Sequence, residues 1–197
     1  MTEDFSGSPA VSATPGDARH DGLDVGPEIR ELDLNGYRAA IPDLVELTRD
    51  AVAGGTAINF MTDTPAAQIE AWWTARTDSV AAGLTSPFVA RLEGRIVGCT
   101  LLVRAGNPNA PHRAEIAKVI VHRSARRRGI ARELMLAAEH RARADGRWML
   151  VLDTFTGSAA DALYRSLGWH ETGIVPDFAL NTEGRPEAAT FFWKDLR

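Results

Sequence analysis

The chain has 197 residues, a length that allows one domain with a sizeable hydrophobic core. Its formal net charge of -4 argues against wholesale binding to nucleic acid, and Cys99 has no second cysteine with which to form an intramolecular disulfide. No apolar run approaches the length of a membrane span, and no basic start precedes an apolar stretch at the N-terminus. We expect a globular, cytoplasmic protein in which Cys99 is a core thiol.

The first residues differ in composition from the remainder. Residues 1–27 are rich in Ser, Gly, Ala, Pro and Asp, and they hold almost no large apolar side chain besides Phe5. Such a segment buries too little surface to offset its ordering entropy. We therefore expect a disordered tail over 1–27 and a folded domain over 28–197.

The beginning of the domain predicts one strand and two helices. Alternating apolar and charged residues indicate a strand over 29–34, and an apolar stripe indicates a helix over 37–53, with Pro42 as a candidate kink. Thr64 is expected to cap a second helix that starts at Pro65 and runs to Gly83.

A hairpin and a strand–loop–helix unit follow. Two apolar runs, 88–92 and 95–103, flank a tight turn at Glu93-Gly94, which is typical of a β-hairpin. The β-branched run 116–121 predicts a buried strand, and apolar residues at i, i+4 spacing predict an amphipathic helix over 130–144.

The last part of the chain predicts three more strands and a short helix. The continuous apolar run 149–152 is typical of a central parallel strand. A capping-box-like start at Ser158 predicts a helix that ends near Gly168. Residues 169–173 and 190–194 are expected to form the final strands, with a loop over 176–186 between them.

The loop before the helix at 130–144 carries the strongest functional signal. Five arginines lie between Arg123 and Arg132, and Gly129 precedes the helix directly. The first amides of a helix lack intrahelical partners, the macrodipole adds positive potential there, and glycine permits close approach of the backbone. This arrangement predicts a phosphate cradle, whereas a solvated charge run or a nucleic-acid patch is the less specific alternative.

Arg126-x-x-Gly129-x-Ala131 matches the (Q/R)-x-x-G-x-(G/A) pyrophosphate loop of the GNAT superfamily of acetyl-CoA-dependent N-acetyltransferases. Other segments resemble the tabtoxin-resistance family, so that the resemblance covers the chain from about Ile29 to its end. It implies an α/β GNAT fold, a mixed central β-sheet with helices on both faces. The segments are Gly54–Met61, Arg113–Ile116, Leu152–Thr154, Gly157–Ala160, Leu163–Trp169 and Phe191–Lys194.

The resemblance also implies acetyl-CoA as co-substrate. The arginine loop is expected to hold its phosphates through backbone amides and guanidinium groups. The backbone of Val119 to Val121 is expected to pair with the pantetheine amides like an extra strand. The predicted coenzyme-binding residues are Val119, Ile120, Val121, Arg126, Arg127, Arg128, Gly129, Ile130, Ala131, Arg132, Ser158, Ala159 and Tyr164.

Two carboxylates are candidates for the removal of the amine's proton. Strand rise places Glu115 about 13 Å back from Val119, in the direction of the thioester, which makes it the first candidate. Asp153 is the second, because it lies at the C-terminal end of an apolar strand, where α/β sheets place their sites. The resemblance to the tabtoxin-resistance family implies that the two carboxylates act together on a water. A surface ion pair with Arg113 or Lys118 is the alternative for Glu115, and a loop cap is the alternative for Asp153.

The same two carboxylates present a geometric difficulty. Glu115 starts its strand whereas Asp153 ends the next one, so a regular parallel pair would keep them far apart. Splaying of these two strands is a superfamily feature that could bring the carboxylates into one cleft.

Tyr164 falls where the superfamily commonly places a tyrosine that protonates the leaving thiolate; core packing is the alternative. By resemblance, residues 56–61 line the acceptor pocket, and Asn59 and Phe60 are the predicted substrate-binding residues. The five histidines are scattered without ligand spacing, so no metal is expected.

Together these features predict an N-acetyltransferase that moves an acetyl group to a primary amine of a small molecule by direct attack in a ternary complex. The resemblance suggests an amino-acid-like toxin or antibiotic as acceptor. Acetylation of a protein N-terminus or lysine, and a non-catalytic acyl-CoA-binding module, are the alternatives. No nucleic-acid or membrane partner is expected, and a homodimer is the default expectation.

Overall fold

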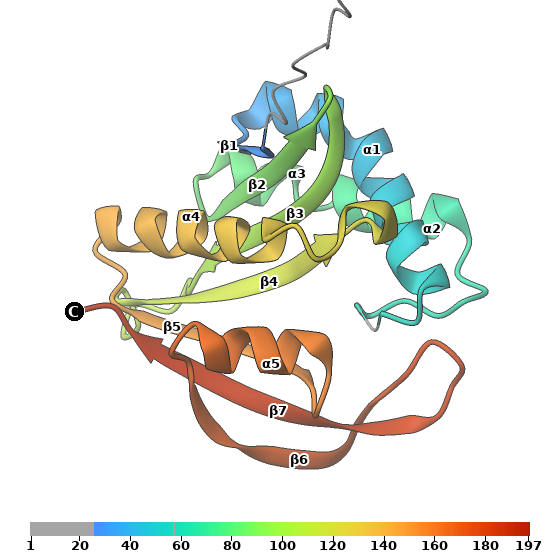
Figure 1. Cartoon of the computed structure of the whole chain (residues 1–197). Coiled ribbons are helices and arrows are strands. Elements are labelled where there is room, and N and C mark those ends of the chain that lie inside the picture. The colour runs from blue at the N-terminus through green and yellow to red at the C-terminus, as the bar shows by residue number, and fades with distance from the viewer. Residues whose placement is uncertain (1–25, 57) are drawn as a thin grey trace, which may run out of the picture.

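The computed structural model describes residues 26–56 and 58–197, so nearly all of the predicted N-terminal tail lies outside the described residues. A seven-stranded sheet with the order β1-β2-β3-β4-β5-β7-β6 forms the centre (Figure 1). β4 and β5 are parallel, and every other neighbouring pair is antiparallel. The strands are β1 (Glu28–Glu31), β2 (Thr85–Leu92), β3 (Arg95–Arg104), β4 (Arg113–Val121), β5 (Met149–Phe155), β6 (His170–Leu180) and β7 (Pro186–Asp195).

Helices cover both faces of this mixed sheet, as predicted. α1, α2 and α3 lie on one face, and α4 and α5 lie on the other (Figure 1). Among the described helices, none combines the length and hydrophobicity needed to cross a bilayer. The helices are α1 (Leu34–Ala53), α2 (Ala66–Thr74), α3 (Thr77–Ala81), α4 (Ile130–Ala144) and α5 (Ala159–Ser166), with a 3₁₀ turn at Arg123–Ala125.

A bulge in β4 changes which face its side chains occupy. Lys118 has a φ of 55°, and it lies where the pairing register between β3 and β4 shifts. Ile116 before the bulge lies in the core beneath α4 and α5, and the half-buried Val119 after it packs against the same core, although the two are three positions apart. Because neighbouring strand residues face opposite ways, Glu115 points to the side of α1 and α2.

β4 and β5 pair over a short distance and then diverge. Their parallel ladder joins only three residue pairs, from Arg113 with Met149 to Glu115 with Val151. Beyond Glu115, β4 continues to Val121 without a β5 partner. The predicted splay is therefore present, and it opens the sheet at one end.

The N-terminal elements differ from the prediction in their boundaries. The first strand ends at Glu31, and α1 already begins at Leu34 because the Asp33 carboxylate caps it, accepting from the Gly36 amide at 2.7 Å. Pro42 lies inside α1, which is assigned as one continuous helix.

The second predicted helix is two helices. α2 ends at Thr74, and α3 starts at Thr77. Pro65 rather than Thr64 occupies the N-cap of α2, because the Thr64 hydroxyl accepts from the Met61 amide (2.9 Å) instead of a helix amide.

The prediction of a loop over residues 176–186 is wrong. β6 extends to Leu180 and β7 starts at Pro186, so the connecting turn is short. Between Val175 and Ala179 the register shifts, and Asp177 has a φ of 50°. This bulge accommodates Pro176, whose missing amide cannot join a regular ladder.

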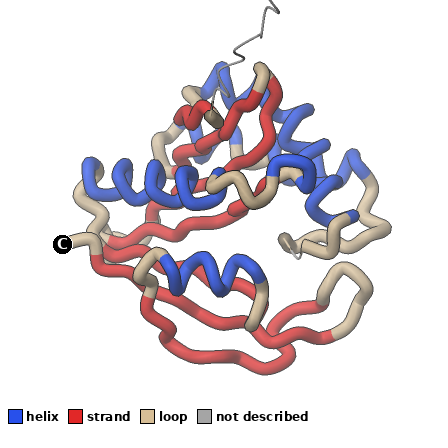
Figure 2. The backbone as a smooth tube through the Cα atoms, viewed as in Figure 1, coloured by secondary structure: helices blue, strands red, loops and turns tan. Residues whose placement is uncertain are grey.

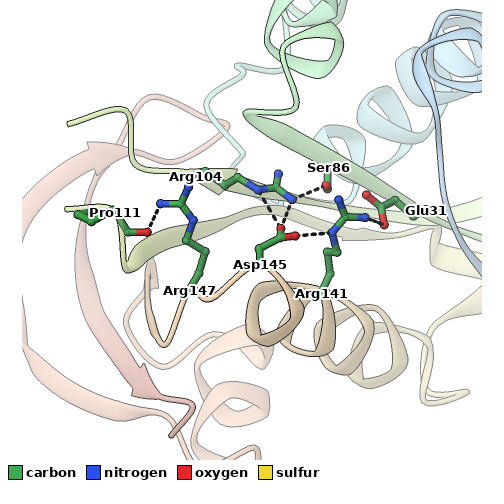
Figure 3. Close-up of polar contacts among 7 residues, drawn as sticks. All are labelled: Glu31, Ser86, Arg104, Pro111, Arg141, Asp145 and Arg147. Carbon is green, nitrogen blue, oxygen red and sulfur yellow. Dashed lines mark hydrogen bonds and ion pairs between the residues drawn. The ribbon is translucent and has the colours of Figure 1, made fainter. Parts of the chain in front are cut away.

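An ionic network fastens the end of α4 that lies away from the basic loop (Figure 3). The buried Arg104 guanidinium donates to Asp145 and to the Ser86 hydroxyl (3.0 Å). Arg141 donates to Asp145 (3.0 Å) and to Glu31 (2.6 Å). Burial alone would raise the pKa of Asp145, but the hydrogen bonds from Arg104 and Arg141 bring it below its ordinary value. The network therefore joins α4 to β1 and β3.

Candidate active site

A cavity of about 650 Å³ lies at the divergence of β4 and β5, over the start of α4. Its wall contains most of the predicted coenzyme-binding residues. Arg128 is exposed and does not line the cavity, and Tyr164 lines a neighbouring one. The predicted residues that line it are Val119, Ile120, Val121, Arg126, Arg127, Gly129, Ile130, Ala131, Arg132, Ser158 and Ala159.

The loop before α4 has the geometry of an anion cradle. Arg127 and Gly129 both have positive φ, 62° and 79°, which turns successive amides toward one concavity. The first helical hydrogen bond runs from the Glu133 amide to the Gly129 carbonyl at 3.1 Å, so the three amides before Glu133 lack an intrahelical partner. A Cβ on Gly129 would meet nothing within 4 Å, so the space beside this residue is open.

The arginines of this loop have different partners. Arg123 donates to the Asp50 carboxylate at 2.8 Å and thereby ties the loop to the end of α1. Arg126 donates to the Thr56 hydroxyl at 3.2 Å, across the mouth of the cavity. Arg127 lines the cavity and makes no hydrogen bond or ion pair with the described part of the chain. Arg127 is therefore the side chain most available for a phosphate.

The end of β4 offers an unpaired backbone edge to the same cavity. Ile120 and Val121 pair with β3 on one side. On the other side the β5 ladder has already ended at Glu115. A ligand with amide groups can therefore pair with β4 as an additional strand.

A second, smaller cavity of about 170 Å³ adjoins the first. The two cavities share a wall of five residues: Thr56, Val119, Thr154, Phe155 and Ala160. The second cavity brings together the predicted Glu115, Asp153, Tyr164 and Asn59, and it also contains Lys118, Phe178 and Leu180, which the sequence did not single out.

Glu115 and Asp153 lie in this one cavity, and the large separation expected for a regular strand pair is not found. The register pairs Glu115 with Val151, so Asp153 lies two residues further on the same side, about 7 Å along the strand. Burial raises the pKa of both carboxyls, and the Asp153 charge raises the pKa of Glu115 further. Neither forms an ion pair within the described residues.

Tyr164 combines a core ring with a hydroxyl at the cavity. The ring packs 6.1 Å from Trp169 and 6.0 Å from Phe192, centroid to centroid, and the residue is 4% exposed. Burial, together with the Asp153 charge, raises the pKa of the phenol, so the hydroxyl keeps its proton. Tyr164 is thus a proton donor in reach of the same cavity as the two carboxylates.

Of the two predicted acceptor-binding residues, only Asn59 lines the second cavity. Asn59 has a φ of 70°. Phe60 lies behind the wall: it is 7% exposed and packs edge-on against Trp72 at 5.9 Å. The opposite wall comes from β6, through Phe178 and Leu180. Figure 2 shows the turn of the β6–β7 hairpin and the loop after α1 at the same end of the sheet.

Lys118 is the functional candidate that sequence reasoning missed. Its ammonium donates to the Ile58 carbonyl at 3.0 Å and lies 4.7 Å from the centre of the Trp72 ring. Burial and the nearby Arg76 cation lower the pKa of Lys118 to about 8. The sequence offered one signal for this residue: lysine is rare in the chain, and Lys118 and Lys194 are its only two lysines.

Cys99 is buried, as predicted, and burial raises the pKa of its thiol to about 12. Such a thiol is not a nucleophile near neutral pH. Among the described residues, no group of three or more His, Cys, Asp or Glu side chains is arranged to hold a metal ion.

The fold, a mixed sheet that opens between β4 and β5 beside an anion cradle, is that of an acetyltransferase. Residues 55–169 match the family model of the acetyltransferase (GNAT) family, and the chain belongs to this family. The matched residues include the loop before α4 and the diverging strands β4 and β5. Resemblance to the tabtoxin-resistance family in particular stays a prediction.

Solved structures share the fold. The protein yncA from Salmonella typhimurium, solved with its cofactor acetyl-CoA, is 23% identical with a TM-score of 0.70, over 87% of this chain and 95% of that one. A ribosomal-protein-alanine N-acetyltransferase from Brucella melitensis is 26% identical with a TM-score of 0.68, over 86% and 99%. An N-acetyltransferase from Staphylococcus aureus Mu50 is 18% identical with a TM-score of 0.71, over 87% and 99%.

Proposed function

We propose that this protein transfers the acetyl group of acetyl-CoA to a primary amine of a small molecule, such as an amino-acid-like toxin or antibiotic. The observation that carries the proposal is that two cavities of different chemistry adjoin and share five lining residues. One has an anion cradle at a helix N-terminus, and the other has two carboxylates and a protonated tyrosine. Donor and acceptor can therefore occupy the protein together, which supports direct attack in a ternary complex.

The larger cavity is suited to the coenzyme. The amides before Glu133 and the free Arg127 side chain would bind the pyrophosphate. The open edge of β4 would pair with the pantetheine amides and direct the thioester past Val119. Val119 lines both cavities, so the acetyl group would reach the carboxylates.

The smaller cavity supplies the proton transfers. An amine at neutral pH is mostly protonated, and Glu115, with Asp153 beside it, would take its proton directly or through a water. The amine nitrogen then bonds to the thioester carbonyl carbon as the carbon–sulfur bond breaks. Tyr164 would give its proton to the departing thiolate. The raised pKa of Glu115 makes its carboxylate a stronger base, and the raised pKa of Tyr164 keeps its hydroxyl protonated until the thiolate departs.

A second candidate acceptor is a protein N-terminus. The structurally similar Brucella melitensis enzyme, at 26% identity, is a ribosomal-protein-alanine N-acetyltransferase. A peptide would enter between the segment at Asn59 and the β6 wall at Phe178. The small volume of the second cavity, about 170 Å³, favours the small amine.

The proposal is tested by calorimetric titration with acetyl-CoA, followed by release of free thiol with a panel of amines. The panel contains amino acids, aminoglycosides and an alanine-initiated peptide. Saturable binding together with thiol release by a small amine is the expected result. Turnover of the peptide alone would favour the second candidate, and binding without turnover of any amine would favour a non-catalytic acyl-CoA-binding module.

A further inference from the structure

The two lysines of the chain lie in opposite environments. The Lys194 ammonium donates to both Glu139 carboxylate oxygens (2.8 Å each) and to the Leu167 carbonyl (2.7 Å), which uses all three of its donors. Lys118 makes a single hydrogen bond to a described residue, to the Ile58 carbonyl. Lys194 is therefore fixed by a carboxylate, whereas Lys118 is not.

Lys118 also lies within the acceptor cavity, at the bulge of β4. The charged and titratable groups around it are the Arg76 cation, the Cys99 thiol and the carboxylates of Asp153 and Glu115. Burial and Arg76 lower its pKa to about 8 against the opposing effect of the carboxylates. A large fraction of Lys118 is thus the free, nucleophilic amine in mildly alkaline solution.

We infer that Lys118 is an internal acetyl acceptor, modified by the enzyme itself when acetyl-CoA is bound and no amine fills the acceptor cavity. This inference rests on the proposed function, because the donor must occupy the larger cavity. Val119, the residue next to Lys118, lines both cavities, so a thioester that passes Val119 comes close to the Lys118 backbone. To turn toward it, the long, flexible side chain would leave the Ile58 carbonyl and the face of the Trp72 ring, and it has no carboxylate partner to break from.

The step is the proposed reaction with a different amine. The Lys118 nitrogen bonds to the thioester carbonyl carbon, and the carbon–sulfur bond breaks. The proton released from nitrogen passes to Glu115 or Asp153, and the thiolate takes one from Tyr164 to leave as the free thiol.

The product is a neutral amide that fills part of the acceptor cavity and removes its cation. The acetyl group would occupy space in a cavity of about 170 Å³. Acetylation of Lys118 would therefore restrain the enzyme while acceptor is scarce, and a bound acceptor would protect Lys118 by occupying the space in front of it.

The test incubates the full chain with acetyl-CoA alone and follows its intact mass, with peptide mapping of the product. We expect a gain of one acetyl group at Lys118 and none at Lys194, which serves as the internal control. The rate should rise with pH and level off near the Lys118 pKa of about 8, whereas an ordinary lysine amine continues to deprotonate up to about pH 10.4. Lys118→Arg should show no gain and should still bind acetyl-CoA by calorimetry.

Two results would overturn the inference. One is a protein that binds acetyl-CoA and leaves Lys118 unmodified over many hours. The other is acetylation of Lys118 at an equal rate in the denatured chain, which would indicate ordinary chemical reaction with the thioester. Absence of acetyl-CoA binding by calorimetry would instead remove the proposed function, and the inference would fall with it.

Discussion

The two adjoining cavities are built in different ways. The coenzyme cavity is formed mainly by one continuous stretch, from Val119 to Arg132, and much of its chemistry comes from backbone amides. The acceptor cavity is formed by residues that lie far apart in sequence, from Thr56 to Leu180. The backbone of one short stretch is thus enough to bind the coenzyme. Recognition of the acceptor depends instead on how strands that are distant in sequence pair with one another. This contrast predicts that substitutions will separate coenzyme binding from chemistry.

Glu115→Gln should have the largest effect. Glutamine keeps the shape of the side chain but cannot accept the amine's proton, so kcat should fall by about 10²–10⁴-fold, the usual contribution of a general base. Binding of acetyl-CoA should stay within about twofold by calorimetry, because Glu115 does not line the larger cavity.

The matched control is Asp153→Asn, which tests whether the pair acts together. A loss of similar size in both variants, with little further loss when they are combined, would indicate one functional unit. Unchanged turnover in Glu115→Gln would remove the proposed base and favour a role for Asp153 alone.

Gly129→Glu should have the opposite effect to Glu115→Gln: it should weaken the binding of acetyl-CoA directly. A side chain at a φ of 79° costs about 1–2 kcal/mol, and the new carboxylate would face the phosphates. We expect affinity for acetyl-CoA to fall by about 100-fold or more, since each tenfold corresponds to about 1.4 kcal/mol. Arg128→Gln, at the neighbouring position outside the cavity wall, should change it only a few-fold through long-range attraction.

The elements specified by local sequence were predicted well. Glu93-Gly94 forms the expected turn between β2 and β3, and Ser158 caps α5 by accepting from the Asp161 amide. The loop from Arg126 to Gly129 precedes α4 as expected. In each case a few adjacent residues determine the backbone, so the sequence pattern is informative by itself.

The features that depend on tertiary pairing were not predictable. The proximity of Glu115 to Asp153 follows from the β4–β5 register, which no local pattern encodes. The bulge that turns Lys118 into the acceptor cavity has the same origin. The segment 176–186 contains two prolines and a glycine and was taken for a loop, because a bulge that tolerates Pro176 within β6 has no distinct sequence signal.

That segment supplies the third prediction. Phe178 lines the acceptor cavity and packs edge-on against Phe191, with ring centroids 5.0 Å apart. Phe178→Ala should raise the KM for the amine by about tenfold through lost apolar contact, with affinity for acetyl-CoA unchanged. Ile174→Ala is the matched control, since Ile174 is a similarly exposed apolar residue of β6 that lies outside the cavity. Equal effects from both variants would mean that β6 acts only through stability.

The smallest effect concerns pH. Burial raises the pKa of Glu115 and of Asp153, whereas the Lys118 cation lowers both. Activity should be lost as pH falls through these raised pKa values, in a range where Lys118 is charged because its own pKa is about 8. Lys118→Met removes that cation, so the two carboxyl pKa values should rise and the acid limb of kcat/KM should move to higher pH.

Lys118→Arg keeps the charge and should leave the limb in place, which separates the electrostatic effect from packing. A limb that stays fixed in Lys118→Met, measured with the same amine, would show that the acceptor cavity screens Lys118 from the carboxylates. Proton transfer by Glu115 and Asp153 would then be as independent of Lys118 as coenzyme binding is expected to be.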